Sequence, residues 1–243
     1  MNHSTTRTKA SGTIIENSAM TKMKSSKPKK AVIFDLDGTL LDTIEDIADS
    51  MNDVLDRYGF PRHSIAEYKL FVGDGAANLV RRSVCGADVT EDVLTRLEEG
   101  YRAEYLKRHA DKTKPYDGIP ELLKALADRG VKLAVLSNKP HDSTEKVMAY
   151  YFPDVAFDAL IGQRPGRPIK PDPCGAFEIL EILGAEMEEV LYIGDTDTDM
   201  LTAKAAGLKA VGALWGFRDK KELAANGADL YAVHPMDLMD LFA

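Results

Sequence analysis

The sequence predicts an α/β fold in which a mostly parallel sheet carries an all-helical insert after its first strand. From residue 31 onward, short β-rich runs alternate with helical segments, which is typical of a parallel sheet. Between residues 44 and 115 the strand signal disappears, and apolar residues recur at helical spacing. The chain has 243 residues, 44% of them hydrophobic, which is enough for a sizeable core and an insert.

The expected sheet has its strands in short, mainly apolar runs. These runs span residues 31–34, 131–136, 159–161, 190–193, 209–213 and 230–233. Helices are expected between them, over residues 121–128, 176–183 and 200–206. Gly130, Gly184 and Gly207 stand near the ends of these helices, because glycine readily takes the left-handed conformation found there. Residues 31–43 and 116–243 form the predicted core.

The insert, residues 44–115, is predicted to be a helical cap. Ile44, Ile47 and Met51 begin a helical spacing of apolar residues, and Ser64-x-x-Glu67 has the pattern of a capping box. In parallel α/β sheets the loops at the carboxyl ends of strands build the site. An insert that leaves just after the first strand would therefore lie above that site as a lid.

The first 30 residues are predicted to be a disordered basic leader. They hold seven Lys or Arg and one acid, a net charge of +6, which leaves −14 on residues 31–243. The acidic body opposes nucleic-acid binding, and no apolar run approaches the roughly 20 residues that cross a bilayer. Cys85 and Cys174 form no disulfide framework and are expected to be small buried hydrophobes. We expect a cytoplasmic protein with neither nucleic acid nor membrane as a partner.

The first strand ends in the most informative motif, Asp35-x-Asp37-Gly38-Thr39. The strand would present Asp35 as a nucleophile, and Asp37 would donate or accept a proton. Gly38 would let the backbone turn sharply, and Thr39 offers a hydroxyl to phosphate or substrate. This arrangement indicates phosphoryl transfer.

Later segments supply companions for a bound phosphate. Ser137 and Asn138 end the next strand and can donate to phosphate oxygens, although such a pair is also common in ordinary turns. Lys170 lies among prolines that restrict its backbone, and its ammonium is the charge that a phosphate requires. A lone lysine is otherwise usually solvated.

Three acids, Asp195, Asp197 and Asp199, occupy a strand-to-helix turn. Acids there bind a hard cation or simply complement the helix dipole. Together with Asp35 and Asp37 they would gather five carboxylates at one end of the sheet, which is costly unless a divalent cation neutralises them. Mg²⁺ is the expected cation, because it prefers a few carboxylates together with waters and substrate phosphate.

These four motifs, in this order over roughly residues 31–240, resemble those of haloacid dehalogenase superfamily phosphatases. The closest resemblance is to the phosphoglycolate phosphatase branch, which has a Rossmann-like core and a helical cap. It implies that Asp35 is the nucleophile and a metal ligand. It also implies that Asp37 is the general acid and base, with its backbone carbonyl on the metal. Dehalogenation is not expected, because the dehalogenases of the superfamily lack this second aspartate.

The implied reaction is Mg²⁺-dependent hydrolysis of a small phosphomonoester through an aspartyl-phosphate, with 2-phosphoglycolate the best single substrate. Ser137, Asn138 and Lys170 would hold the phosphate. Asp195 would ligate the metal directly. Asp199 would either ligate it through water or support a neighbouring residue. The resemblance gives Asp197 no assured role.

The cap segment Gly73-x-Gly75 opens a helix and resembles the substrate-specificity loop of phosphoglycolate phosphatases. Its N–H groups could bind a small carboxylate, or the segment could be a plain interhelical turn. Asp74, between the glycines, places negative charge where an anionic substrate would approach. Thr43 either touches substrate or caps the first helix of the insert.

Other functions fit parts of this pattern. A sugar-phosphate mutase like β-phosphoglucomutase would keep every core motif but rephosphorylate its product. A pyrophosphatase or nucleotidase would differ only in the cap. A non-catalytic protein would use the basic leader on nucleic acid or an acidic membrane. The expected partner of the folded chain is a small phosphorylated metabolite, and the expected assembly is a monomer or homodimer.

Overall fold

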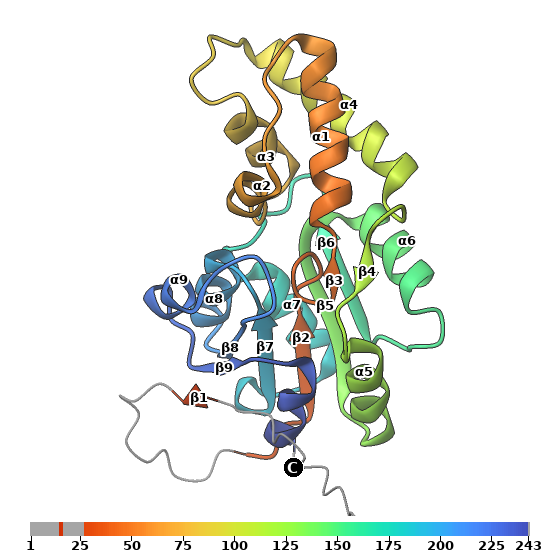
Figure 1. Cartoon of the computed structure of the whole chain (residues 1–243). Coiled ribbons are helices and arrows are strands. Elements are labelled where there is room, and N and C mark those ends of the chain that lie inside the picture. The colour runs from red at the N-terminus through yellow and green to blue at the C-terminus, as the bar shows by residue number, and fades with distance from the viewer. Residues whose placement is uncertain (1–14, 17–26, 243) are drawn as a thin grey trace, which may run out of the picture.

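Among residues 15–16 and 27–242, which the computed structural model describes, the core is a seven-stranded sheet with helices on both faces (Figure 1). The strand order is β1-β9-β8-β7-β2-β5-β6, and neighbours are parallel except β1 and β9. The strands are β1 (Ile15–Glu16), β2 (Ala31–Phe34), β5 (Lys132–Pro140), β6 (Ala159–Gln163), β7 (Val190–Gly194), β8 (Lys209–Ala213) and β9 (Leu230–Ala232). The predicted strands and the mostly parallel sheet are confirmed.

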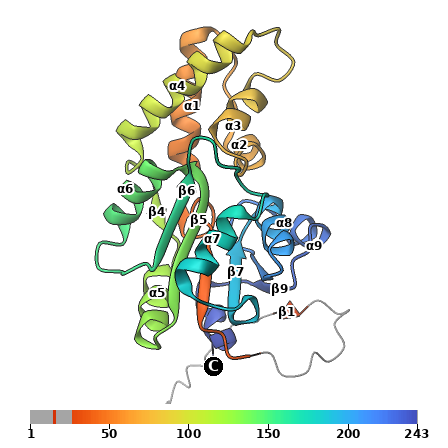
Figure 2. The same ribbon diagram turned by 180° about the vertical axis from the view of Figure 1, so that it is seen from behind.

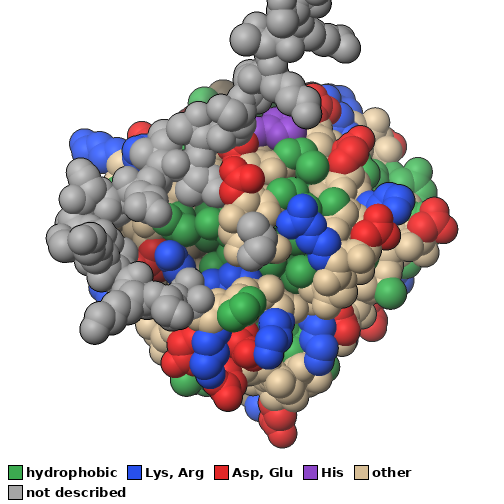
Figure 3. Space-filling model, turned by 90° about the horizontal axis from the view of Figure 1, so that it is seen from below, with side chains coloured by type: hydrophobic (Ala, Val, Ile, Leu, Met, Phe, Trp, Pro, Cys, Tyr) green, Lys and Arg blue, Asp and Glu red, His purple; other side chains and the backbone are tan. Residues whose placement is uncertain are grey.

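The leader contains one short strand. Ile15–Glu16 pairs antiparallel with β9 at the sheet edge, so the expectation of disorder over residues 1–30 does not hold for these two residues. Residues 27–30 are described as well, and Lys30 N donates to Glu189 O at 2.8 Å. The remaining leader residues, 1–14 and 17–26, lie outside the described part of the chain. Lys30 Nζ pairs with Glu189 Oε1 at 2.6 Å, and Lys27 pairs with Glu186. On the end of the molecule opposite the cap, basic and acidic side chains lie side by side (Figure 3).

β2 shows how the sheet builds two hydrophobic cores. Val32 and Phe34 point to one face and Ala31 and Ile33 to the other, because successive side chains of a strand alternate, and all four are fully buried. The helices that cover the two faces are α5 (Ile119–Asp128), α6 (His141–Tyr151) and η2 (Pro235–Phe242) on the first, and α7 (Cys174–Leu183), α8 (Asp197–Ala205) and α9 (Lys220–Ala225) on the second (Figure 2). A single turn, η1 (Met187–Glu189), precedes β7. The central strand is thus packed on both sides.

Four helices lie within residues 44–115, all of which are described, and they form a cap inserted after the first core strand. Its helices are α1 (Ile44–Tyr58), α2 (Ile65–Phe71), α3 (Ala76–Ser83) and α4 (Glu91–Arg108), and they share a hydrophobic core of their own. The predicted capping box is present at α2, where Ser64 N donates to Glu67 Oε2 at 2.8 Å. Thr43 stands at the N-cap position of α1, as one of its two predicted roles requires, but its hydroxyl makes no capping hydrogen bond.

The two segments that join core and cap pair with each other. β3 (Leu41–Asp42) and β4 (Lys114–Pro115) form a two-stranded antiparallel ribbon, which the expectation of an all-helical insert did not include. The buried carboxylate of Asp46, in the first turn of α1, accepts hydrogen bonds from Lys112 N, Thr113 N and Thr113 Oγ1 at 2.7–3.1 Å. The base of the cap is therefore fastened where the chain enters and leaves it.

A loop of the core also reaches into the cap. Phe217, which follows β8, is 8% exposed and packs in the hydrophobic core of the cap. Next to it, Arg218 Nη2 donates to the carbonyl oxygens of Val72 at 2.8 Å and Leu70 at 3.2 Å. These contacts hold the cap against the core.

We expect Phe217→Ala to lower the free energy of unfolding by about 3 kcal/mol, because it removes a buried ring from the core of the cap. Phe177→Ala is the matched control: Phe177 lies on α7 and is 46% exposed, so its loss should stay below about 1 kcal/mol. Chemical denaturation of both variants measures the difference. Equal losses would contradict a packing role for Phe217 in the cap.

Two further expectations concern the whole chain. No helix in residues 27–242 is long and apolar enough to cross a membrane. Cys85 and Cys174 are free thiols, as the lack of a disulfide framework suggested. Cys85 is exposed and Cys174 partly so, and the expectation that both are buried hydrophobes is therefore wrong.

Candidate active site

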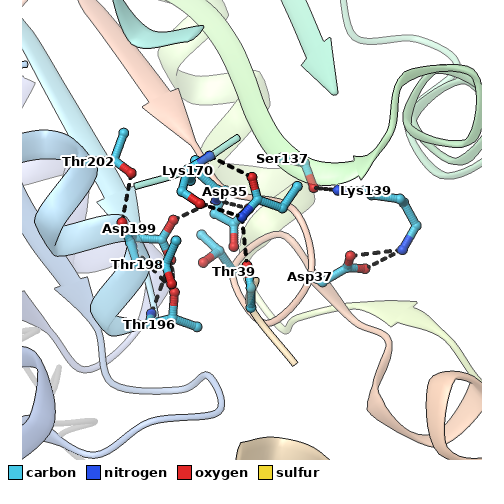
Figure 4. A network of polar contacts seen from close by, with 12 residues as sticks. Asp35, Asp37, Thr39, Ser137, Lys139, Lys170, Thr196, Thr198, Asp199 and Thr202 are labelled. Atoms are coloured by element: carbon cyan, nitrogen blue, oxygen red, sulfur yellow. Dashed lines mark hydrogen bonds and ion pairs between the residues drawn. The ribbon is translucent and has the colours of Figure 1, made fainter. Parts of the chain in front are cut away.

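The predicted core residues meet at the carboxyl ends of three neighbouring strands (Figure 4). Asp35 follows β2, Asp195 follows β7, and Ser137 lies in the last part of β5. β2 pairs in parallel with β5 on one side and β7 on the other, which brings these distant segments to one edge of the sheet. Lys170 joins them from the loop before α7.

Three predicted metal ligands form a buried cluster of negative charge. One carboxylate oxygen from each of Asp35, Asp195 and Asp199 lies within 4.8 Å of the others, and all three residues are buried. Burial and the charge of Asp199 raise the pKa of Asp195 to about 7. The same two causes raise the pKa of Asp35 well above its ordinary range. A divalent cation would relieve this repulsion, and carboxylate oxygens suit Mg²⁺.

Lys170 brings positive charge to this cluster. Its Nζ lies 2.7 Å from Asp35 Oδ1 and 2.7 Å from Asp199 Oδ1, and its side chain is 2% exposed. Burial alone would lower the pKa of Lys170, but the charges of Asp199 and Asp35 outweigh it and raise that pKa well above its ordinary value. The lysine therefore stays protonated beside Asp35.

Asn138 holds the Lys170 loop and the cap loop together. Its Nδ2 donates to Lys170 O and to Gly73 O, each at 3.0 Å, and its Oδ1 accepts from Lys170 N at 2.8 Å. The sequence predicted that this amide would bind phosphate. In the structure its hydrogen bonds position the lysine and dock the cap.

Asp195 is oriented by two hydrogen bonds and two glycines. Thr39 Oγ1 donates to Asp195 Oδ1, and Phe217 N donates to Asp195 Oδ2, both at 2.8 Å. A Cβ on Gly38 would lie 2.3 Å from Asp195 Oδ2, and one on Gly216 would lie 2.2 Å from Asp195 Cβ, so neither position accepts a side chain. Thr39, predicted to contact phosphate or substrate, is fully buried and orients this carboxylate.

Asp199 belongs both to the start of α8 and to the buried carboxylate cluster, and its binding of a cation stays a prediction. It forms a capping box at the start of α8, where Thr196 N and Thr196 Oγ1 donate to its Oδ2 at 3.1 and 2.7 Å. Its Oδ1 accepts from Tyr192 and faces Lys170 within the carboxylate cluster. Asp197, the third acid of the turn, lies outside that cluster.

Asp37 is paired with a lysine that sequence reasoning missed. Lys139 Nζ lies 2.9 and 2.8 Å from the two carboxylate oxygens of Asp37, away from the Asp35–Lys170 contacts (Figure 4). The side chain of Lys139 is 6% exposed, and Nζ lies 4.4 Å from the ring centre of Tyr105. A lysine directly after Ser137 and Asn138, at the same strand end, was the signal that could have found it.

Core and cap line an open cavity of about 150 Å³ over this site. Asp35, Asp37 and Ser137 line it from the core, and Gly73 and Gly75 line it from the cap. The rest of the cap wall is largely apolar, formed by Ile47, Val72, Ala76, Leu79, Tyr101, Tyr105 and Leu106. The insert therefore covers the carboxylates, as expected of a lid.

Asp74 does not add charge to this cavity. It is absent from the described lining residues, although Gly73 and Gly75 on either side line it. Arg82 pairs with one Asp74 oxygen, and Thr198 Oγ1 donates to the other at 2.5 Å. Asp74 is thus neutralised and fastens the cap to α8.

Comparison with known proteins agrees with the resemblance. Residues 32–213 match the family model of haloacid dehalogenase-like hydrolases. The phosphoglycolate phosphatase of Aquifex aeolicus is 34% identical over 212 residues, which are 87% of this chain and 96% of that relative. Phosphoglycolate phosphatase 1 of Pseudomonas aeruginosa is 30% identical over 213 residues, which are 86% of this chain and 78% of that relative.

A solved structure supports the fold independently. The crystal structure of a predicted phosphoglycolate phosphatase from Haemophilus somnus is 26% identical and superposes with a TM-score of 0.83. The superposition covers 90% of this chain and 100% of that one. Family model, sequence relatives and structure thus agree, and the chain belongs to the haloacid dehalogenase-like hydrolase family.

Proposed function

We propose that this protein is a Mg²⁺-dependent phosphatase that hydrolyses a small phosphomonoester, 2-phosphoglycolate, through a phosphorylated Asp35. One observation carries the proposal: Asp35, held 2.7 Å from Lys170, and Asp37 line the same cavity. A nucleophile and a separate acid facing one cavity are what transfer of a phosphoryl group to an aspartate requires.

The reaction consists of two displacements. A carboxylate oxygen of Asp35 attacks phosphorus, the ester P–O bond breaks, and Asp37 gives a proton to the leaving alkoxide. A water molecule then attacks the phosphorus of the aspartyl-phosphate while Asp37 takes its proton, which releases inorganic phosphate and regenerates Asp35. Asp37 thus serves as acid and then as base.

Phosphate oxygens would meet Ser137 and Lys170. The Ser137 hydroxyl accepts a hydrogen bond from Lys139 N at 3.1 Å, and its own proton remains to donate to phosphate. Lys170 would face the negative charge that develops on the equatorial oxygens.

The buried carboxylates fit a magnesium ion. Asp35, Asp195 and Asp199 would hold it, and the backbone carbonyl of Asp37 would add a ligand. When bound, Mg²⁺ neutralises this cluster and withdraws charge from the phosphate oxygens. The pKa values of Asp35 and Asp195 are raised because burial and the charge of Asp199 disfavour their ionised forms when no metal ion is bound.

Cavity size and relatives support a small substrate. About 150 Å³ leaves room for a compact phosphomonoester, and two relatives at 34% and 30% identity bear the name phosphoglycolate phosphatase.

Phosphate release from a substrate panel tests this proposal. The panel contains 2-phosphoglycolate, glucose 1-phosphate, pyrophosphate and AMP, each assayed with Mg²⁺, with EDTA, and with Mg²⁺ restored. We expect 2-phosphoglycolate to be hydrolysed fastest, EDTA to stop release and Mg²⁺ to restore it. Release that persists in EDTA would contradict the metal site. Turnover of a sugar phosphate that needs a bisphosphate activator and frees no phosphate would indicate a mutase.

The metal site also predicts that the stability of the fold depends on pH, which can be measured without any turnover. The pKa of Asp195, about 7 against an ordinary 3.8, means that the metal-free folded state binds this proton more tightly than the unfolded chain. The free energy of unfolding should therefore fall by on the order of 2 kcal/mol as pH rises from about 5.5 to about 7. Mg²⁺ competes with the proton, so it should raise Tm more at about pH 7.5 than at about pH 5.5.

Thermal unfolding in EDTA and in Mg²⁺ at the two pH values measures this effect. Asp195→Asn is the control, because it removes this titrating group and should reduce the dependence to the part that Asp35 contributes, whose pKa burial and Asp199 also raise. An equal Mg²⁺ shift at both pH values in the wild type would show that Asp195 does not titrate with the metal.

A further inference from the structure

Lys139 is a buried cation that the proposed chemistry leaves without a task. Its ammonium contacts both carboxylate oxygens of Asp37 and the ring face of Tyr105, and it lines the cavity with them. In the proposed reaction the phosphate is assigned to Lys170, which contacts Asp35 and not Asp37. A second lysine in the cavity wall could therefore bind a second negative group of the substrate.

We infer that Lys139 binds an anionic group of the substrate that is attached one carbon from the leaving oxygen, and that Asp37 holds this ammonium while the site is free. The inference rests on the proposed function and adds to it the residue that would select a substrate with a second anionic group.

Distances place such a group within reach of Lys139. Asp37 must come within about 3 Å of the leaving oxygen in order to protonate it. Lys139 Nζ lies 2.8–2.9 Å from the same carboxylate. In an α-phosphoryloxy acid the carboxylate carbon is only two bonds, each of about 1.5 Å, from the leaving oxygen. A substrate carboxylate can therefore reach the Lys139 ammonium while Asp37 contacts the leaving oxygen.

The charges around the cavity favour Lys139 over the other candidate. Among the described residues that line the cavity, the cations are Arg102 and Lys139, and the acids are Asp35, Asp37 and Asp142. Arg102 already donates from Nε and Nη2 to Glu98 at 3.0 and 2.5 Å. A substrate carboxylate facing three acids needs a cation that can exchange its partner, and Lys139 can exchange Asp37 for substrate.

The cap contributes to this site through Tyr105. The Lys139 ammonium lies over the Tyr105 ring of α4, on the apolar wall of the cavity. An ammonium largely shielded from water binds an anion more strongly than one in solvent. Recognition of the second anionic group would thus require the cap to be closed.

A paired substrate experiment tests the inference. Wild type, Lys139→Gln and Lys139→Arg are assayed with 2-phosphoglycolate and with 2-hydroxyethyl phosphate, in which a neutral alcohol replaces the carboxylate. For Lys139→Gln we expect kcat/KM to fall about 100-fold with 2-phosphoglycolate, mostly through KM, and less than about threefold with 2-hydroxyethyl phosphate. Lys139→Arg keeps the charge and should recover part of the loss. Lys146→Gln, an exposed lysine on α6, is the matched control and should leave both substrates unchanged.

Other outcomes would overturn the inference. Equal losses on both substrates would show that Lys139 only positions Asp37. If kcat/KM fell selectively for 2-phosphoglycolate in Arg102→Gln but not in Lys139→Gln, Arg102 and not Lys139 would be the residue that binds the anionic group. If Lys139→Gln does not fold, Lys139→Arg takes its place. The inference then predicts that wild-type kcat/KM is higher for 2-phosphoglycolate than for 2-hydroxyethyl phosphate, and that this ratio is smaller in Lys139→Arg. A wild type that hydrolyses both substrates equally refutes the inference but keeps the phosphatase, whereas no hydrolysis of any phosphomonoester refutes the proposed function itself.

Discussion

Asp35→Asn should abolish turnover, with a loss in kcat on the order of 10⁴-fold or more, while the protein stays folded. The amide has the shape of the carboxylate but is a far weaker nucleophile, so the first displacement stops. The substitution also removes one charge from a cluster in which burial and the charge of Asp199 raise the pKa of Asp35. Without metal, the variant should therefore be as stable as the wild type or more so.

Steady-state phosphate release and thermal unfolding measure these two effects. Asp197→Asn is the matched control, because Asp197 lies on the same edge of the sheet but outside the carboxylate cluster. The control should keep nearly full activity. An Asp35→Asn enzyme with wild-type kcat would refute the nucleophile assignment.

Lys170→Met should be the other severe substitution. It removes the cation 2.7 Å from both Asp35 and Asp199 and leaves their charges buried without that partner. We expect the free energy of unfolding in EDTA to fall by about 3 kcal/mol and kcat/KM to fall about 1,000-fold. Mg²⁺ should restore part of the stability but little of the activity, because it replaces the charge near the carboxylates and not the contact with phosphate.

Denaturation and kinetics of Lys170→Met are compared with those of Lys204→Met, an exposed lysine on α8 that should change neither property. If Lys170→Met matched this control in stability, the ion pairs at 2.7 Å would make no net contribution to folding.

The fold was predictable because the strands near the site are buried on both faces. β2 is a run of four apolar residues, and its successive side chains enter opposite cores. At the end of such a strand the chain changes from apolar to polar residues. Asp35 and Asp195 were therefore recognisable as residues at the carboxyl ends of their strands. Parallel pairing then brings them together whatever their separation in sequence.

The parts that escaped prediction depend on contacts between distant segments. Lys139 pairs with Asp37 across 102 residues, and no local pattern marks that contact. β3 and β4 have two residues each, too short to show alternation. Phe217 lies in a core loop but packs in the cap, which no periodicity can reveal.

Two polar residues were identified, but the structure places them in other contacts. Thr39 and Asn138 have the donors that phosphate binding needs, so the sequence could not separate a ligand contact from a supporting one. Thr39 orients Asp195, and Asn138 holds Lys170 and the cap loop. Thr39 is fully buried, whereas Asn138 also lines the cavity, so its contact with phosphate stays a prediction.

Trapping the covalent intermediate tests the central claim most directly. Wild-type protein is mixed with Mg²⁺ and with 2-phosphoglycolate that carries its radiolabel on phosphorus. The mixture is quenched in acid during the first turnover and digested for peptide mapping. The account predicts label on the peptide that contains Asp35, removed by hydroxylamine as expected for an acyl phosphate, and absent from Asp35→Asn. Inorganic phosphate released in the first turnover with no labelled protein, or label on another residue, would contradict it.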